Sequence, residues 1–294
     1  MFAYLMLAVI SGGSQGLGYA LAKKYKDIGY DVVLVARTEL KLRAAAHKLG
    51  VRYIRADCSD PEECARVFEQ LAVPDLVVCC AGAAHPGMFL DLDPADLKTN
   101  LDVVYCTALY FSQAAMRVMA AAHDKLLQRR QIVYCSSTVA VFPFAGYAAY
   151  APAKAAIRAL SDIVRQECLP HNIRVSHILP GSMDTEGYAI EESIKPALVK
   201  RIEGPSAAIS AQDAADIVFR QLENGEDTVY TDTVSWVLGS MMLGTSPRWG
   251  FGILQSLVGI LLVLFGPVVR WFIDRDVMSD VYSTQQAKTK TKSR

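Results

Sequence analysis

Residues 5–18 read LMLAVISGGSQGLG, an apolar run that leads directly into a glycine-rich turn. A strand, a turn of this kind and a following helix form a common dinucleotide site, because glycine lets the backbone approach a pyrophosphate and the helix N-terminus supplies N–H donors. Gly12, Gly16 and Gly18 have the spacing GxxxGxG rather than GxGxxG. By itself the turn also fits a connection that only packs a helix against a strand.

Short apolar runs alternate with amphipathic stretches along most of the chain. Seven runs predict strands, at 5–10, 31–36, 52–56, 76–80, 131–135, 173–178 and 228–230. Helical periodicity predicts helices at 16–28, 39–49, 61–71, 94–122, 150–169 and 211–223. The fourth of these stretches is long enough for two helices or one bent helix. Such alternation is typical of an α/β fold whose parallel sheet is covered by helices on both faces.

The composition excludes several classes of protein. The chain has 294 residues, of which 52% are hydrophobic, enough for a packed core in one or two domains. Its 30 basic and 30 acidic side chains cancel, so no overall charge favours nucleic acid as a partner. The seven cysteines form no CxxC pair, which indicates reduced thiols and argues against a disulfide framework or a metal site.

A serine, a tyrosine and a lysine follow in an order that suits proton transfer. The run 131–135 ends in Ser136 and Ser137, and Tyr150 and Lys154 lie one helical turn apart further on. A free tyrosine has a pKa of about 10, and we expect the ammonium to lower it. Tyr150 is then a general acid toward a carbonyl oxygen that Ser137 also holds. With the glycine turn, this pattern indicates a hydride-transfer enzyme.

The same pattern leaves alternatives. A Tyr-x-x-x-Lys pair is by itself a frequent helix-face pair. Tyr147 is a second tyrosine, but no lysine lies four residues after it. Ser136 is a second serine, and strand alternation points it away from Ser137.

The residues after the second and third predicted strands bear on which dinucleotide binds. An NAD site places an acidic residue after the second strand for the ribose hydroxyls, whereas this chain has Arg37, with Lys41 one turn later. An arginine grips a 2′-phosphate, and Lys41 and Ser14 add to that contact, so the sequence favours NADP(H). Solvated surface cations are the alternative. Asp57 accepts from the adenine amino group or serves a turn.

Together these features resemble the short-chain dehydrogenase/reductase family over residues 5–230. The resemblance implies a doubly wound, Rossmann-type domain with a seven-stranded parallel sheet. It gives Ser137, Tyr150 and Lys154 the catalytic roles and implies that Asn100 helps to position a proton-relay water. One departure is the sequence CCAG at 79–82, where the family usually has Asn-Asn-Ala-Gly.

A narrower resemblance is to the branch of this family that reduces 3-ketosphinganine to sphinganine in sphingolipid synthesis. It is carried by GGSQG at 12–16, VART at 35–38 and PGSMDTEGY at 180–188, followed by EE at 191–192 and KP at 195–196. The resemblance implies NADPH as cofactor and a long-chain ketolipid as substrate. The residues implied to contact NADPH are Gly12, Ser14, Gln15, Gly16, Leu17, Gly18, Arg37, Lys41, Asp57, Gly82, Tyr150 and Lys154.

Two other interpretations of function stay open at this point. One keeps the fold but makes the substrate a steroid or a 3-ketoacyl thioester. The other is a catalytically idle scaffold that binds NADPH. We also expect a homo-oligomer.

The C-terminal part differs in composition from the rest. Residues 250–269 carry no charged side chain, over about the length that crosses a bilayer core, and 234–245 form a shorter apolar stretch. Arg270, Arg275 and the tail lysines favour a cytosolic tail. We therefore expect a re-entrant hairpin or an interfacial segment rather than a single pass. A buried core helix or an oligomer interface is the alternative.

The expected organisation has three parts. A catalytic NADPH-binding domain occupies 1–232, with a substrate loop at 182–210. A membrane-associating segment follows at 233–275. A polar, basic tail occupies 276–294, which we expect to be disordered from 285, and its Lys290 and Lys292 resemble a retrieval signal as well as a solvated basic tail. The implied location is the endoplasmic reticulum membrane, with the catalytic domain facing the cytosol.

Overall fold

The computed structural model describes residues 5–122, 129–204, 208–241 and 252–292. Its centre is a seven-stranded, fully parallel sheet in the order β3-β2-β1-β4-β5-β6-β9. The strands are β1 (Leu7–Ser11), β2 (Asp31–Ala36), β3 (Arg52–Arg55), β4 (Leu76–Cys79), β5 (Arg130–Cys135), β6 (Ile173–Leu179) and β9 (Thr228–Tyr230). All seven predicted strands are confirmed, with ends that shift by one or two residues.

The strand order reverses between β1 and β4. From β1 the chain moves outward through β2 and β3, and it then returns to pair β4 with the other side of β1. In an open parallel sheet, ligands bind beyond the carboxyl ends of the strands at such a switch point. The glycine turn leaves β1 at this crevice.

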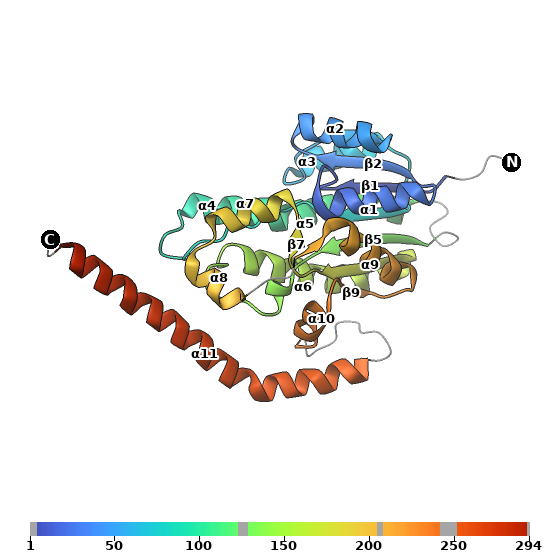
Figure 1. Cartoon of the computed structure of the whole chain (residues 1–294). Coiled ribbons are helices and arrows are strands. Elements are labelled where there is room, and N and C mark those ends of the chain that lie inside the picture. The colour runs from blue at the N-terminus through green and yellow to red at the C-terminus, as the bar shows by residue number, and fades with distance from the viewer. Residues whose placement is uncertain (1–4, 123–128, 205–207, 242–251, 293–294) are drawn as a thin grey trace.

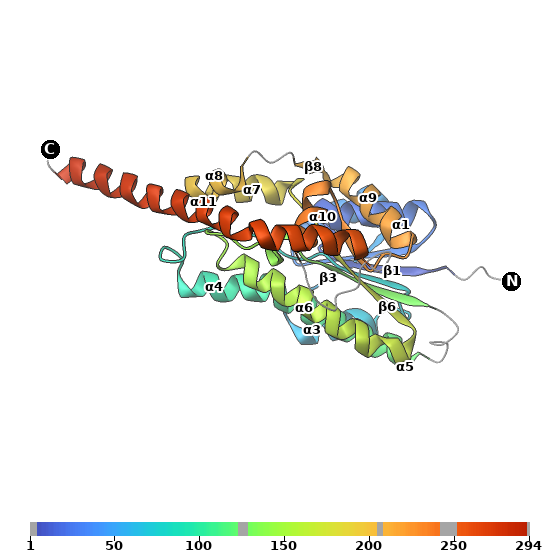
Figure 2. The ribbon, with the colours of Figure 1, turned by 90° about the horizontal axis from the view of Figure 1, so that it is seen from below.

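Helices cover both faces of the sheet (Figures 1 and 2). One face is covered by α1 (Gly16–Asp27), α2 (Glu39–Leu49) and α9 (Ala211–Glu223). The other is covered by α3 (Pro61–Glu69), α5 (Thr107–Ala121) and α6 (Tyr150–Cys168). Strand residues alternate between the two cores, so that Ile10 joins the first and Val9 the second. The predicted doubly wound fold is confirmed.

The predicted helix 94–122 is interrupted by a π-helical turn. It consists of α4 (Pro94–Leu101), the π-turn η1 (Asp102–Cys106) and α5. Such turns are frequent at functional sites. Val103 of this turn lines the cavity described below, and Asn100 lies buried in the last turn of α4.

The segment 182–210 is built of short elements that pack on the sheet domain. In chain order they are β7 (Met183–Asp184), α7 (Glu186–Ile194), α8 (Ala197–Glu203) and β8 (Ile209–Ser210). Thr185 caps α7 by accepting from the backbone N–H of Tyr188 at 3.1 Å. Val199 of α8 is buried against Tyr147. Residues 205–207 lie outside the described part of the chain.

Helix α10 (Thr233–Gly239) follows β9 and belongs to the packed core. The Asp232 carboxylate accepts from the backbone N–H of Ser235 at 2.8 Å and so caps the helix. Trp236 packs against Tyr230. The first half of the apolar stretch 234–245 is therefore in contact with the sheet domain, and residues 242–251 lie outside the described residues.

Helix α11 (Ile253–Lys292) is 40 residues long. It begins beside α10, passes α8 and extends away from the domain (Figures 1 and 2). The buried Gln255 ties its start to the domain by donating to the Tyr230 hydroxyl at 3.1 Å. Pro267 lies inside the helix, where proline removes a backbone hydrogen bond, and the helix is bent in Figure 1. Because α11 continues to Lys292, the expected disorder from residue 285 is wrong.

A buried histidine on β6 makes the stability of this fold depend on pH. His177 is 3% exposed, and its Nε2 has no hydrogen-bond partner among the described residues. Burial lowers the pKa of His177 to about 4. Below a pH of about 6.5, His177 is therefore protonated in the unfolded chain but still neutral in the folded chain. The free energy of unfolding falls as the pH decreases toward 4.

We predict that this histidine costs about 2 kcal/mol of stability between pH 8 and pH 5. Urea unfolding of the wild type and of His177→Gln at both pH values measures it. The variant lacks the titrating group, so its loss over this interval should be smaller by that amount. Equal losses in the two proteins would contradict the prediction.

Candidate active site

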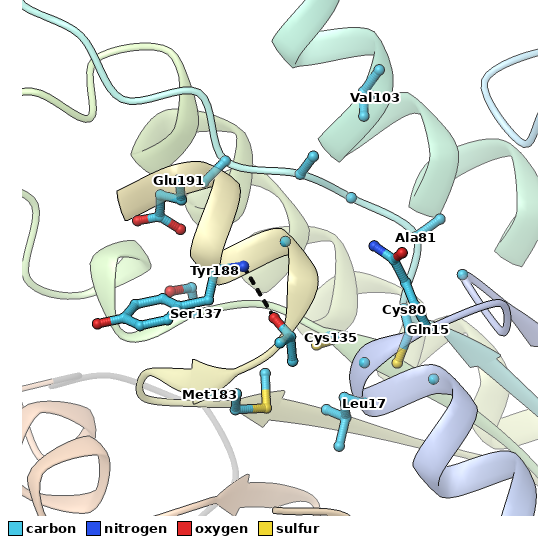
Figure 3. Close-up of a pocket in the computed structure, with 18 of the residues that line it drawn as sticks. Gln15, Leu17, Cys80, Ala81, Val103, Cys135, Ser137, Met183, Tyr188 and Glu191 are labelled. Atoms are coloured by element: carbon cyan, nitrogen blue, oxygen red, sulfur yellow. Dashed lines mark hydrogen bonds between the residues drawn. The ribbon is translucent and has the colours of Figure 1, made fainter. Parts of the chain in front are cut away.

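A cavity of about 450 Å³ opens beyond the carboxyl ends of β1, β4 and β5 (Figure 3). The structure brings nearly every residue predicted for the site into its wall. These residues are Gly12, Ser14, Gln15, Gly16, Leu17, Gly18, Arg37, Lys41, Asp57, Gly82, Ser137, Tyr150 and Lys154. Asn100 is the exception and lies behind the wall.

The glycine turn is shaped by two close approaches of backbone. A Cβ on Gly12 would lie 2.7 Å from the Ala81 nitrogen, and one on Gly18 would lie 2.5 Å from the Gly12 oxygen. Gly12 and Gly16 also have positive φ, of 68° and 57°. A side chain on Gly12 would push the turn away from the end of β4, one on Gly18 would collide with the Gly12 carbonyl, and Gly16 needs glycine for its positive φ.

The N-terminus of α1 faces this cavity with its backbone donors open to a ligand. Gln15 is the N-cap residue, and its side chain makes no capping hydrogen bond. The first turn contains no acidic residue. A helix start of this kind, next to backbone that lies flush with the cavity, suits the negative charge of a pyrophosphate.

Two cations stand at the rim of the cavity, near the end of β2. Arg37 lies 3.8 Å from the Asp57 carboxylate, and Lys41 pairs with Glu186 of α7 at 2.5 Å. Both cations are about half exposed. They can be reached by an anionic group that enters over the rim, as the prediction of a 2′-phosphate site requires.

Asp57 is held in place by its own turn. Its Oδ1 accepts from the backbone N–H of Ser59 at 2.9 Å and from the Ser59 hydroxyl at 2.7 Å. Although burial opposes the change, these hydrogen bonds and the charge of Arg37 lower the pKa of Asp57. The turn function predicted as an alternative is therefore present, and the same carboxylate lines the cavity.

Ser137, Tyr150 and Lys154 meet at the floor of the cavity. Tyr150 begins α6, and Lys154 lies one turn further on, where its Nζ is 5.6 Å from the centre of the Tyr150 ring. Lys154 also donates to the Cys135 carbonyl oxygen at 2.8 Å. Ser137 caps the 3-10 helix η2 (Thr138–Ala140) and lies close enough to Tyr150 to lower its pKa. The end of β5 and the start of α6 therefore hold the three side chains together.

Ser136 and Tyr147, the alternative serine and tyrosine, hydrogen-bond other groups of the protein. The Ser136 hydroxyl is buried and donates to the Lys154 carbonyl oxygen at 2.8 Å. The Tyr147 hydroxyl donates to the Glu191 carboxylate in a short hydrogen bond. These contacts favour Ser137 and Tyr150 for contact with a substrate.

The expectation that Lys154 lowers the pKa of Tyr150 is wrong. Burial, followed by the charge of Glu191, raises the pKa of Tyr150 above its usual range, and the hydrogen bond with Ser137 only partly offsets this. Burial also lowers the pKa of Lys154. Both shifts arise because the protein packed around the two side chains makes their charged forms costly. Tyr150 thus holds its proton at neutral pH, as a proton donor must.

Asn100 stands one layer behind the cavity. Its Nδ2 donates to the Ala83 carbonyl oxygen at 3.4 Å, and Ala83 lines the cavity. Its buried Oδ1 has no partner among the described residues. The side chain therefore keeps an acceptor available next to the wall, which suits the predicted contact with a relay water.

The sequence CCAG at 79–82 leaves thiols where the family has amides. Cys80 and Cys135 both line the cavity. Gly82 has a φ of 157°, and a Cβ there would lie 3.7 Å from Lys154 Nζ. The backbone path past the site is thus retained without the amides.

The wall opposite the glycine turn contains residues that sequence analysis missed. Figure 3 shows Tyr188 and Glu191 on α7 at the end of the pocket that also holds Ser137, while Gln15 and Leu17 lie at the other end. Periodicity did not reveal them because α7 is short and amphipathic only in part. Their signals were the stretch 180–188 and the pair EE at 191–192, both quoted for the narrower resemblance, and their place in the predicted substrate loop 182–210.

Comparisons with known proteins give the family of this chain. Residues 6–193 match the family model described as short chain dehydrogenase. The chain is 40% identical to the 3-ketodihydrosphingosine reductase TSC10 of Yarrowia lipolytica, over 96% of this chain and 79% of that protein. It is 38% identical to the protein of the same name from Debaryomyces hansenii, over 92% and 88%.

Solved structures share the fold. A short chain dehydrogenase from Burkholderia cenocepacia, crystallised in complex with NADP, superposes with a TM-score of 0.67 over 81% of this chain and 93% of that one, at 24% identity. The chain belongs to the short-chain dehydrogenase family. Within that family it is similar over most of its length to yeast 3-ketodihydrosphingosine reductases.

Proposed function

We propose that this chain is an NADPH-dependent reductase that converts 3-ketodihydrosphingosine (3-ketosphinganine) to sphinganine. The observation that carries the proposal is the meeting of Ser137, Tyr150 and Lys154 in one cavity with the glycine turn, in a chain 38–40% identical to reductases with that substrate in their name. A steroid, a 3-ketoacyl thioester and an idle scaffold rank behind it, because the relatives that are similar over most of the chain are named as 3-ketodihydrosphingosine reductases.

The residues of the cavity fit a dinucleotide. Gly12, Gly16 and Gly18 line the cavity without side chains, so backbone faces a ligand there. The α1 N-terminus offers its donors beside them. Arg37 and Lys41 at the rim suit the 2′-phosphate that distinguishes NADPH from NADH. Once bound, NADPH supplies a hydride to the ketone carbon.

The protein's own contribution is to place and protonate the ketone oxygen. Tyr150 donates its proton to that oxygen, and Ser137 donates a second hydrogen bond to it. Lys154 keeps two N–H donors beyond the one given to Cys135, and they serve the ribose hydroxyls. Asn100 holds the water that returns a proton to the site. The product is the alcohol, with one hydride on carbon and one proton on oxygen.

A long-chain ketone dissolves in a bilayer, and α11 suits an enzyme that collects it there. Its residues Ile253–Asp276 form a helix long and apolar enough to cross a membrane, and little of it is covered by the rest of the chain. Along this stretch Leu261 and Leu264 are 54% and 68% exposed. We propose that α11 attaches the enzyme to the endoplasmic reticulum with the catalytic domain on the cytosolic face, where NADPH is supplied.

The rest of the organisation stays part of the proposal. We retain the division into 1–232, 233–275 and 276–294, with α10 packed on the catalytic part of the chain. The homo-oligomer and a retrieval function of Lys290 and Lys292 stay predictions.

Replacing Tyr150 by Phe removes the proton donor and keeps the ring. We expect kcat/KM for 3-ketosphinganine to fall by about 100- to 10,000-fold. NADPH binding, followed by fluorescence titration, should change little. Oxidation of NADPH is measured with 3-ketosphinganine beside a steroid ketone and an acetoacetyl thioester. Turnover retained by the variant would overturn the assignment of Tyr150, and wild-type activity on another ketone alone would overturn the substrate.

Replacing Arg37 by Asp removes the group that binds the 2′-phosphate and adds an acceptor for ribose hydroxyls. A charged hydrogen bond contributes about 1.5–3 kcal/mol, so the ratio of kcat/KM for NADPH to that for NADH should fall by about 10- to 150-fold. Arg43→Asp makes the same charge change on α2, away from the cavity wall, and should leave the ratio unchanged. An unchanged ratio in the Arg37 variant would exclude the phosphate contact.

Two aspartates in α11 test attachment to the membrane. Each costs about 2.5–3.5 kcal/mol near the centre of a bilayer-inserted helix, so Leu261→Asp with Leu264→Asp should move the protein from membranes to the soluble fraction. Flotation with liposomes measures this. Leu40→Asp changes an equally exposed leucine on α2 and should float like the wild type. Unchanged flotation of the double variant would show that α11 is not the attachment.

A further inference from the structure

The wall of the cavity opposite the glycine turn is built around an internal ammonium group. The side chain of Lys195 is fully buried, and its Nζ lies 3.3 Å from Glu191, 2.5 Å from Glu203 and in a shorter contact with Glu192. The rings of Tyr147 and Tyr188 lie 5.9 and 5.4 Å from the same nitrogen. Carboxylates and aromatic faces are the groups that recognise an ammonium ion.

The members of this cluster divide into those that face the cavity and those behind. Glu191, Glu203 and the two tyrosines line the cavity, whereas Lys195, Glu192 and Lys200 are not among the lining residues. The cluster contains three carboxylates, those of Glu191, Glu192 and Glu203, and two lysines. Lys195 contacts all three carboxylates, and Lys200 lies 3.6 Å from Glu192. The cavity therefore meets surplus negative charge on this side, with the cations behind it.

Glu191 is the carboxylate closest to the chemistry. Its negative charge is one of the causes that raise the pKa of Tyr150, so the two groups interact electrostatically across the pocket. Its carboxylate is oriented by the Tyr147 hydroxyl and by Lys195. Figure 3 shows it at the end of the pocket occupied by Ser137 and Tyr188.

The proposed substrate carries a positive charge at a matching position. In 3-ketosphinganine the amino group is on the carbon next to the ketone. An amine beside a carbonyl has a pKa of about 7.7–8.0, so it is mostly protonated at neutral pH. When the ketone oxygen contacts Tyr150 and Ser137, the ammonium group lies one carbon away.

We infer that Glu191 binds the 2-ammonium group of the substrate and thereby selects 2-amino ketones over neutral ketones. This inference rests on the proposed function and names the residue responsible for its specificity. Glu203 adds negative charge to the same wall, and the Tyr188 ring offers a cation–π face. Lys195 is a positioning residue, because it holds the carboxylates in place from behind.

The charge of Lys195 is maintained by its neighbours. Although burial opposes it, the three carboxylates and Tyr147 raise the pKa of Lys195. The cluster therefore does not relax by losing this proton. One Lys195 ammonium group contacts three carboxylates, so its single positive charge does not neutralise them all. The remaining negative charge can bind a second ammonium ion.

The test compares two substrates that differ only in the amine. They are 3-ketosphinganine and 1-hydroxyoctadecan-3-one, presented in the same detergent micelles with saturating NADPH. We expect the wild type to prefer the amine by at least about 10-fold in kcat/KM, and Glu191→Gln to lose about 10- to 100-fold on the amine with a much smaller change on the neutral ketone. Glu191→Asp keeps the charge and should recover part of the preference.

The matched control is Glu192→Gln, which removes one carboxylate of the same helix and the same cluster behind the wall. It should keep the preference for the amine. Equal losses on both substrates in Glu191→Gln would show that the cluster only stabilises α7, and would overturn the inference. A wild type that reduces both ketones equally would also overturn it.

A measurement on the wild type alone covers the case in which the variants fold poorly. Octadecylamine and octadecanol are compared as inhibitors, and the inference requires the amine to inhibit at least several-fold more strongly. Equal inhibition would overturn it. Absence of activity on both 3-keto substrates, with activity on a steroid ketone, would instead overturn the proposed function.

Discussion

The close approach of two backbone segments, the turn after β1 and the end of β4, is the constraint on which the rest of this structure depends. Gly12 lies against Ala81 with no room for a side chain, and Gly18 lies against Gly12. This contact brings the α1 N-terminus to the switch point of the sheet. The ends of β4 and β5, with Gly82, Ser137 and the start of α6, are thereby placed around one cavity.

Burial is the second physical factor, and it keeps the proton on Tyr150. Tyr150 and Lys154 are close enough to interact, yet burial rather than attraction dominates both pKa values. A tyrosine kept protonated by burial is suited to donating to an oxygen that becomes negative as hydride arrives. The negative wall at Glu191 acts in the same direction.

The chain deals with its apolar residues in two ways. The strands of the sheet and the helices on its two faces bury theirs in two large cores, and smaller clusters hold α8 and α10. Helix α11 leaves most of its apolar side chains exposed while Gln255 fastens its start to Tyr230. The attachment point lies on the same β9–α10 unit that completes the sheet.

Sequence alone determined the elements that depend on local pattern. The seven strands, the helices between them, the glycine turn and the Tyr150–Lys154 pair follow from periodicity and spacing, which a chain carries in any short window. The same patterns placed Arg37 and Lys41 at the cavity rim. The π-turn after Asn100 and the short helix α7 were not predicted, because each covers too few residues for its periodicity to stand out from the flanking sequence.

Only the tertiary structure decided what depends on distant contacts. It placed Asn100 behind the wall, set Glu191 in front of Lys195 and made α10 part of the core. It also reversed the expected shift in the pKa of Tyr150, because the dielectric around a side chain is set by everything packed against it. The spacing of residues along the chain does not predict which distant residues pack against one another, or how far that packing buries a side chain.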